Sequence, residues 1–487
     1  MSDLAIRVGR INDILCGVNL LQWDSRTKMP AGGAAARGQQ IATLKGLARE
    51  MILAPETQAA AEAALDGPDA DAARVVLEAV AHHTALPAAL LQAQAEQSAE
   101  AGQAWQEARR TADFALFRPY LERSVDLARQ QAEALGYAAH PYDPLVDLYE
   151  PGETAASLST LFDSLRAGIR PILDTARDKT PPRRDFLFRH YPKADQQQLC
   201  HRLAALMGYD FDRGRLDTTV HPFEISMTRS DVRITSRWRE DYLPMAIFGS
   251  LHETGHAMYE QGVAPDLTRT AFATDLRLLY AVGGSSFGMH ESQSRLVENH
   301  IGRALPFWQA HFGLLRDTFP EQLSGVSAED WHAAINYSAP GLTRVEADEL
   351  TYDLHIMLRV RIEMALLDGS LSVADLPEAW NAAMQEDFGL TVPDDGAGCL
   401  QDVHWSMGYF GSFPTYTVGN VTAAALFAEA RQDTGRQTAL ERGDLMPVLA
   451  FLGDKVWRHG RRKTRTEICG TMDTEPYLAH LKARFAG

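Results

Sequence analysis

The sequence predicts a mainly α-helical protein with one small β-hairpin. Residues 57–135 are rich in Ala, Glu, Gln and Leu, which favour helices, and their apolar residues recur at spacings of three and four. Residues 218–238 instead alternate and are rich in β-branched residues, as strands are. A chain of 487 residues is too long to fold around one small hydrophobic core. We therefore expect an N-terminal helical lobe or lid over residues 1–200 and a second helical lobe over residues 201–487, or one continuous domain.

Breaks divide the N-terminal helical region into separate amphipathic helices. Turn-forming residues occur at Asp66–Pro68 and at Leu86–Pro87, and between them Val76 and Val80 lie one helical turn apart. The proline-containing stretch Thr180–Arg184 interrupts the helical pattern again. We interpret this stretch as a connection between the two lobes.

The β-branched region reads as a hairpin with strands over residues 218–226 and 231–238. The polar residues 227–230 between them predict a short turn. A single hairpin is marginally stable in water, so this one must pack on a neighbouring element.

Charge and composition exclude several classes of protein. The chain has 47 Lys and Arg against 64 Asp and Glu, a formal charge of −17, so a nucleic-acid partner is not expected. No apolar run is long enough to span a membrane. Asp3, Arg7 and Arg10 lie where a signal peptide would need an uninterrupted apolar run, so export is not expected. The four cysteines are widely separated, which is typical of reduced thiols. We therefore expect a cytoplasmic protein without a membrane partner.

The residues His252-Glu253-Thr254-Gly255-His256 form the pattern H-E-x-x-H on a predicted helix that ends at Gly262, a residue suited to a left-handed cap. His252 and His256 are one turn apart and share a face, so two imidazoles can bind one zinc ion. Glu253 lies one step round the helix, where its carboxylate can act as the general base on a water molecule. The alternative is a solvated helix face with no metal.

A catalytic zinc site needs a third protein ligand, and Glu291 is the candidate. It follows the flexible Gly283–Gly284 and opens a second helical stretch. Glu298 is the competitor, either as the ligand or as a hydrogen-bond acceptor for a ligand imidazole. His290 is a further possible ligand, although a structural role is commoner, and Arg295, four residues after Glu291, is expected to hold that ligand in place.

These motifs together resemble the carboxypeptidase Taq family of metallocarboxypeptidases. Besides H-E-x-x-H, the resemblance rests on short motifs in the family's order, with one small departure at Thr343: His221–Phe223, Asp231-x-Arg233-x-Thr235, His290–Gln293, Arg344-x-x-Ala347-Asp348 and Gly398-x-x-Gln401-Asp402-x-His404-Trp405. Residues 21–30 and 459–462 also resemble the family, so the resemblance covers nearly the whole chain.

The resemblance implies a fold and an activity. The expected fold is a two-lobed helical zincin, neurolysin-like, with a long substrate groove, in which residues 201–487 form the catalytic lobe. The expected enzyme is a homodimer with zinc, or cobalt as an alternative. It would release single residues from the C-termini of peptide substrates with broad side-chain tolerance.

A carboxypeptidase must hold a free carboxylate, for which the planar fork of an arginine is best suited. Motif position and chemistry favour Arg344 and Arg233, and the resemblance adds Gln401. From spacing alone, the alternative is that Arg344 pairs with Glu346 or Asp348, and Arg233 with Asp231.

The segment 401–416 offers donors for the negative charge that develops on the former carbonyl oxygen. We favour His404 and Tyr416, with Tyr409 in reserve; core packing is the alternative for the tyrosines. Cys399 has no evident activating base and is not read as a nucleophile. The basic run 458–465 is interpreted as an ion-pair region and not as a nucleic-acid patch.

Two other functions remain open. One is an oligopeptidase that cuts internally in short peptides. The other is a non-catalytic helical scaffold that binds peptides, which the intact Glu253 disfavours because a dead site has no need of a base.

Overall fold

The computed structural model describes residues 2–486, and these are mainly helical, as predicted. The α-helices are α1 Asp3–Thr27, α2 Ala34–Leu53, α3 Pro55–Ala64, α4 Ala70–Ala85, α5 Ala88–Thr111, α6 Phe114–Leu135, α7 Asp143–Val146, α8 Ala155–Arg177, α9 Lys193–Leu206, α10 Leu243–Gly262, α11 Phe287–Arg295, α12 Leu305–Thr318, α13 Ala328–Ile335, α14 Glu349–Asp368, α15 Leu376–Phe388, α16 Pro414–Arg431, α17 Thr434–Glu441, α18 Met446–Lys455, α19 Arg465–Cys469 and α20 Glu475–Phe485. The strands are β1 Gly214–Thr218, β2 Glu224–Thr228, β3 Asp231–Ser236, β4 Thr274–Asp275 and β5 Tyr280–Ala281. A π-helical segment, Leu296–Gly302, follows α11.

The chain divides into two compact units, each built from separate segments. The first unit contains the segment up to His83, Pro181–Ile335 and Gly419–Asp473. The second contains Thr84–Thr180, Asn336–Val418 and the residues from Thr474. The predicted lobes of residues 1–200 and 201–487 therefore each contribute to both units, because these helices pack on partners far away in the sequence. A lid role for residues 1–200 stays a prediction.

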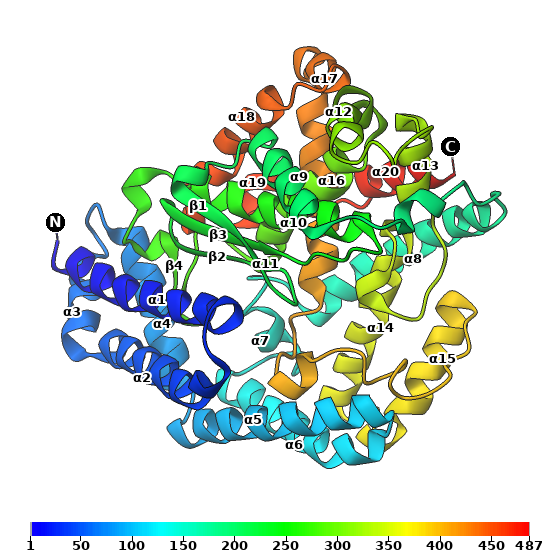
Figure 1. Cartoon of the computed structure of the whole chain (residues 1–487). Coiled ribbons are helices and arrows are strands. Elements are labelled where there is room, and N and C mark those ends of the chain that lie inside the picture. Colours follow the sequence, from blue (N-terminus) through cyan, green and yellow to red (C-terminus); the bar gives the residue numbers. More distant parts are fainter. Residues whose placement is uncertain (1, 487) are drawn as a thin grey trace. The chain divides into compact units, whose positions relative to one another are not determined.

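The predicted hairpin is present but shorter than expected. Strands β2 and β3 pair antiparallel, and β2 begins at Glu224 rather than at residue 218. Pro222 has no N–H to donate, which fits its place outside the strand. A third strand, β1, was not predicted: it pairs parallel with β3, so the order is β1-β3-β2. Strands β2 and β3 both contact α10, so the sheet covers the helix that carries the H-E-x-x-H motif (Figure 1). Strand β2 also contacts α1.

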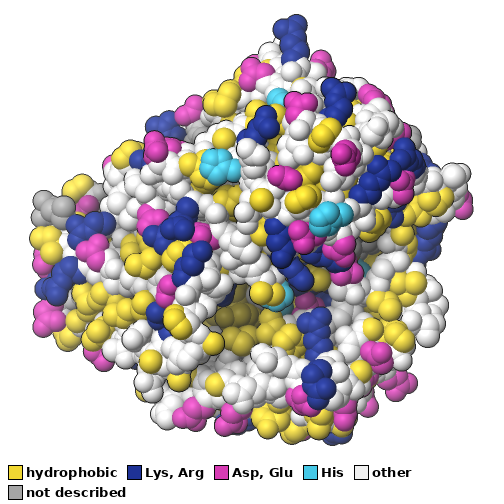
Figure 2. Space-filling view, viewed as in Figure 1, with side chains coloured by type: hydrophobic (Ala, Val, Ile, Leu, Met, Phe, Trp, Pro, Cys, Tyr) yellow, Lys and Arg dark blue, Asp and Glu magenta, His cyan; other side chains and the backbone are white. Residues whose placement is uncertain are grey.

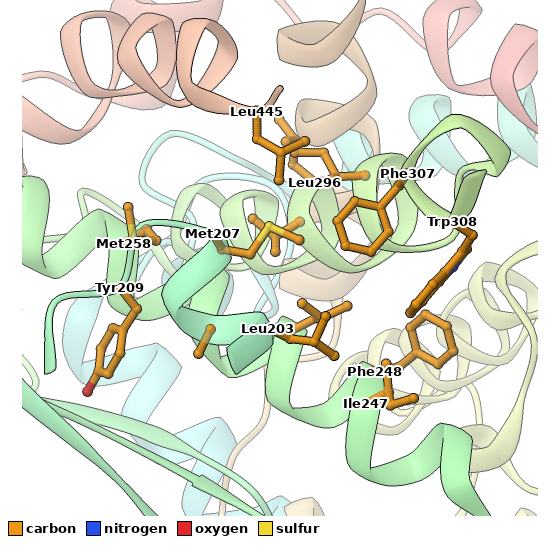
Figure 3. Close-up of a cluster of buried hydrophobic side chains, with 14 of the residues drawn as sticks. Leu203, Met207, Tyr209, Ile247, Phe248, Met258, Leu296, Phe307, Trp308 and Leu445 are labelled. Carbon is orange, nitrogen blue, oxygen red and sulfur yellow. The ribbon is translucent and has the colours of Figure 1, made fainter. Parts of the chain in front are cut away.

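A continuous apolar core fixes α10 within the first unit. Ile247 and Phe248 of α10 pack among side chains of α9, α12 and the π-helical segment (Figure 3). The labelled members of this cluster are Leu203, Met207, Tyr209, Ile247, Phe248, Met258, Leu296, Phe307, Trp308 and Leu445. Full burial of each large apolar side chain stabilises the fold by about 1.5–3 kcal/mol. This packing therefore fixes the position of α10, the helix that carries the motif.

In the second unit, α14 is the central helix. Helices α5 and α6 lie side by side (Figure 1), and α6, α8, α15 and α20 all contact α14. Most of α14 is buried, including the polar residues Asp353, Arg359 and Glu363. A helix buried on nearly all sides must find partners for such groups within the protein.

The surface carries both signs of charge. Lys and Arg side chains are interspersed with Asp and Glu over the face shown in Figure 2. Among the described residues, no helix is both long enough and apolar enough to cross a membrane.

Candidate metal centre

Helix α10 presents His252, Glu253 and His256 in the first unit. It runs from Leu243 to Gly262, and Pro244 lies in its first turn, where a missing N–H is tolerated. Gly262 does not form the predicted left-handed cap; it remains helical, and a Cβ there would lie 2.6 Å from Cβ of Trp457. The glycine is needed for close packing, not for a turn.

A second glycine of α10, Gly255 within the motif, lets the next helix come close. A Cβ added to Gly255 would lie 2.4 Å from the backbone oxygen of Gln293, so only glycine lets α11 approach here. Ser286 caps α11 by accepting from the Met289 N–H. This arrangement carries Glu291 to the two histidines.

The side chains of His252, His256 and Glu291 converge. Glu291 Oε2 lies 3.5 Å from His252 Nε2 and 3.2 Å from His256 Nε2. Ligand atoms about 2.0–2.1 Å from a tetrahedral zinc lie about 3.3 Å from one another. Two imidazoles and a carboxylate are also a ligand set of catalytic zinc sites, so these residues fit a divalent ion.

The outer nitrogens of both histidines have partners. His252 Nδ1 lies 3.0 Å from Glu298 Oε2, and His256 Nδ1 lies 2.5 Å from His290 Nδ1. The structure thus places Glu298 and His290 on the far sides of the imidazoles from Glu291. For Glu298 the geometry favours the acceptor role over the ligand role, and for His290 it favours the structural role.

Arg295 contacts the candidate third ligand as expected. Its Nε donates to Glu291 Oε1 at 2.7 Å, which leaves Oε2 directed to the imidazoles. Burial acts to raise the pKa of Glu291, but Arg295 and then His252 hold that pKa well below its usual range. Burial lowers the pKa of His256 to about 3. A carboxylate and a neutral imidazole are the forms that bind metal.

Glu253 is buried beside the three converging side chains and is not one of them. Burial raises its pKa to about 7, against the opposing effect of His252. A carboxyl group in this range suits proton transfer near neutral pH.

The second unit holds a separate buried cluster. Arg344 donates through Nε and Nη2 to Asp402 Oδ1 at 3.0 and 2.6 Å, and Arg359 Nε donates to Asp402 Oδ2 at 2.6 Å. The ion-pair partner of Arg344 is therefore Asp402, not Glu346 or Asp348. Asp348 instead caps α14 by accepting from two backbone N–H groups. Two guanidinium groups share one carboxylate, so the cluster carries one net positive charge.

Gln401 is part of the same cluster. Its amide donates to the backbone oxygens of Leu342 and Ala397 at 2.8 and 2.6 Å, and its oxygen accepts from Arg359 at 3.2 Å. These contacts hold both the segment and the arginine. A direct contact of Gln401 with substrate stays a prediction.

The candidate donors of segment 401–416 lie at the edge of this cluster. His404 Nε2 is 3.3 Å from the Tyr416 hydroxyl, and burial, followed by Arg344, lowers the pKa of His404 to about 3. The guanidinium of Arg344 lies 5.2 Å from the Tyr416 ring centre. Tyr409 is exposed. The structure brings the side chains of His404, Tyr416 and Arg344 together, whereas the exposed Tyr409 meets them through its backbone N–H, which donates to the His404 oxygen at 3.0 Å.

Arg233 lies in the first unit, on β3. It donates to both oxygens of Asp231 at 2.8 and 2.9 Å, and its guanidinium lies 4.4 Å from the Trp23 ring centre. The pairing with Asp231 is the alternative that spacing alone favoured. This ion pair fixes the orientation of the Arg233 guanidinium, which is partly exposed.

Arg461 of the basic run has an internal role. It donates to the Gly284 oxygen at 2.7 Å and pairs with Asp275 at 2.9 Å. This supports the loop before α11, in line with the ion-pair interpretation of residues 458–465.

A helical fold with H-E-x-x-H and a carboxylate from a following helix defines a metallopeptidase. Residues 3–485 match the family described as Carboxypeptidase Taq (M32) metallopeptidase, and the chain belongs to this family. It is a carboxypeptidase, a metal-dependent hydrolase of peptides, and the predicted family and enzyme class are confirmed.

Relatives align over almost the full length. The chain is 38% identical over 492 residues to thermostable carboxypeptidase 1 of Thermus thermophilus, covering 96% of this chain and 94% of that protein. It is 37% identical over 486 residues to carboxypeptidase 1 of Bacillus subtilis, covering 96% and 92%. The crystal structure of the M32 carboxypeptidase from Deinococcus radiodurans superposes with a TM-score of 0.94 at 37% identity, covering 99% and 98%.

Sequence reasoning missed several residues that support the site. Glu260 accepts from His290, from the Gly283 N–H and from the Ser226 hydroxyl. Its position four residues after His256, on the same helix face, was an available signal. Arg359 gave no such signal, because its partner Asp402 is distant in the sequence.

Proposed function

We propose that this carboxypeptidase is zinc-dependent, with cobalt as an alternative, and releases single residues from the C-termini of peptides with broad side-chain tolerance. The observation that carries the proposal is the convergence of His252 Nε2, His256 Nε2 and Glu291 Oε2 beside the buried Glu253.

His252, His256 and Glu291 would hold a divalent ion, which would supply the positive charge needed to polarise a carbonyl group and acidify a water molecule. Glu253 acts as the general base: it accepts the proton of the attacking water and passes it to the departing amine. Its buried position supports this role, because a carboxyl group with a raised pKa can both accept and return a proton near neutral pH.

Arg344 and Arg233 are the candidates for binding the terminal carboxylate of the substrate. The net positive charge of the cluster around Asp402 supports this assignment, since a second carboxylate can be bound there without excess negative charge. Asp402 and Tyr352 orient the Arg344 guanidinium, the latter through a contact of 2.9 Å. Gln401 is proposed to assist binding through the same cluster.

His404 and Tyr416 stabilise the negative charge on the former carbonyl oxygen, with Tyr409 in reserve. Their mutual contact at 3.3 Å supports a shared role. A neutral His404 carries one N–H and can donate without adding charge.

The wider expectations also belong to this proposal. They are a two-lobed, neurolysin-like arrangement with a long groove, a homodimer, and a cytoplasmic location. Binding of an extended peptide along an edge of the small sheet would suit broad tolerance, because main-chain hydrogen bonds carry no side-chain preference.

Mass spectrometry of digested peptides tests the activity. A peptide with a free C-terminus should yield a ladder of single-residue losses with metal-loaded protein and no ladder after chelation. The same peptide with an amidated C-terminus should stay intact. Cleavage of the amidated peptide at internal bonds would instead identify an oligopeptidase, and no cleavage of either peptide by loaded protein would favour a scaffold.

A further inference from the structure

A buried carboxyl group in the second unit binds the segment that carries the candidate donors. Glu363 lies on α14 and is fully buried. Its Oε1 accepts from the Trp405 indole N–H at 2.9 Å, and its Oε2 accepts from the Gly411 N–H at 3.1 Å and from the Tyr142 hydroxyl at 2.9 Å. Trp405 and Gly411 both lie between His404 and Tyr416 in the sequence.

This segment has little regular structure of its own. A short 3₁₀ turn covers His404–Met407, and α16 begins at Pro414. Between them Gly408 and Gly411 adopt left-handed conformations, with φ of 75° and 87°. A segment without a ladder of backbone hydrogen bonds depends on outside contacts for its position.

The close approach at Gly411 adds a second constraint. A Cβ added there would lie 2.6 Å from the backbone carbon of Leu145. The Gly411 N–H therefore reaches Glu363 only because the segment passes directly against the chain near α7. The carboxyl group and this packing contact define one position for the backbone.

The same helix anchors both ends of the segment. Arg359 of α14 binds Asp402, and Asp353 of α14 accepts from the Thr417 hydroxyl at 2.7 Å. Glu363 holds the middle. Thus three polar residues of one buried helix hold the stretch from Asp402 to Thr417.

A carboxyl group is a costly choice for a purely structural contact in a core. Burial raises the pKa of Glu363 to about 7, although the Gly411, Trp405 and Tyr142 donors oppose that shift. In the ionised form both of its oxygens accept, because donors approach each of them. Glutamine would turn its amide N–H toward at least one of these donors.

We propose that Glu363 is a positioning residue for catalysis: by binding Trp405 and Gly411, it sets the placement of His404 and Tyr416. This inference rests on the proposed roles of those two residues.

Three variants of the metal-loaded, full-length protein test the inference. Glu363→Gln disturbs both contacts to the segment, and Trp405→Phe removes one of them. Tyr142→Phe is the matched control. It removes a donor to the same carboxyl group, but Tyr142 itself lies outside the segment. We expect Glu363→Gln and Trp405→Phe to lower kcat at least tenfold with KM and metal content unchanged. Tyr142→Phe should keep kcat within about twofold, whatever its effect on melting temperature.

The double variant Glu363→Gln, Trp405→Phe should be no slower than Glu363→Gln, since Trp405→Phe removes a contact that Glu363→Gln already disturbs. A second readout does not depend on turnover: chymotrypsin cleavage after the exposed Tyr409 should be faster in Glu363→Gln than in Tyr142→Phe. Equal kcat and equal cleavage rates in these two variants would overturn the inference. If Glu363→Gln does not fold, Trp405→Phe against Tyr142→Phe makes the same comparison. Absence of carboxypeptidase turnover in the wild type would contradict the proposed function, whereas the cleavage comparison would still decide the anchoring.

Discussion

His256 and His290 face each other through their Nδ1 atoms at 2.5 Å. If His256 Nε2 serves as a metal ligand, its Nδ1 carries hydrogen and donates to His290 Nδ1. His290 then carries hydrogen on Nε2, which lies 3.0 Å from Glu260 Oε1. A chain of two imidazoles and one carboxylate thus fixes both tautomers, whereas His252 meets the carboxylate of Glu298 directly.

His290→Phe removes the acceptor for His256 while keeping a ring of similar size. We expect the affinity for zinc to fall by about 10–100-fold, the usual cost of losing a group that orients a ligand. Competition with a chromophoric chelator measures this. His201→Phe is the control, because His201 is exposed and stacks on Phe211. An unchanged affinity in His290→Phe would contradict the orienting role.

Glu253→Gln should retain the metal and lose turnover. The amide keeps the size of the side chain but cannot accept a proton, so kcat should fall by about 10²–10⁴-fold. Metal analysis and steady-state kinetics on one preparation check both halves of the prediction. Loss of the metal together with turnover would mean that Glu253 supports the ligands rather than the water.

Arg344→Lys keeps the charge and removes the planar fork. Because two oxygens of a carboxylate bind a guanidinium better than an ammonium, we expect kcat/KM for free-terminus peptides to fall at least tenfold, mainly through KM. Arg361→Lys is the matched control: it lies on α14, is half-exposed and pairs with Glu386 at 3.4 Å. Equal losses in the two variants would remove Arg344 from substrate binding.

Glu363 predicts how stability depends on pH. Burial raises the pKa of this carboxyl group from 4.5 to about 7, with Arg359 among the groups that lower it. The folded state therefore holds a proton that the unfolded state has released between these two values, and stability falls as pH rises through this window. Urea unfolding from pH 4 to 8 should show a steeper slope in the wild type than in Glu363→Gln, because Glu253, whose pKa burial also raises to about 7, adds the same slope in both proteins. A parallel pH dependence in both proteins would exclude a raised pKa.

The metal centre was predictable because its information is local. The spacing of His252 and His256 needs only helical geometry, and the helix containing Glu291 begins after a recognisable glycine pair. What the sequence could not show is why α11 comes so close, which depends on the missing side chain of Gly255 against a backbone distant in the chain.

The cluster in the second unit was predicted only in part. Arg344 was selected by motif and chemistry, but its partner Asp402 was not, because a pairing across many residues leaves no periodic signal. The same holds for the contacts of Glu363 and for the parallel strand β1, which pairs with β3 although β2 lies between them in the sequence. Local patterns predicted the elements, and long-range packing decided their partners.

Metal-binding isotherms of the wild type, Glu291→Ala and Glu298→Ala test the central claim most directly. The claim is that His252, His256 and Glu291 together hold one divalent ion. We predict one zinc per chain in the wild type, almost complete loss of binding in Glu291→Ala, and retained but weaker binding in Glu298→Ala. Full affinity in Glu291→Ala with loss in Glu298→Ala would contradict the claim and reassign the third ligand.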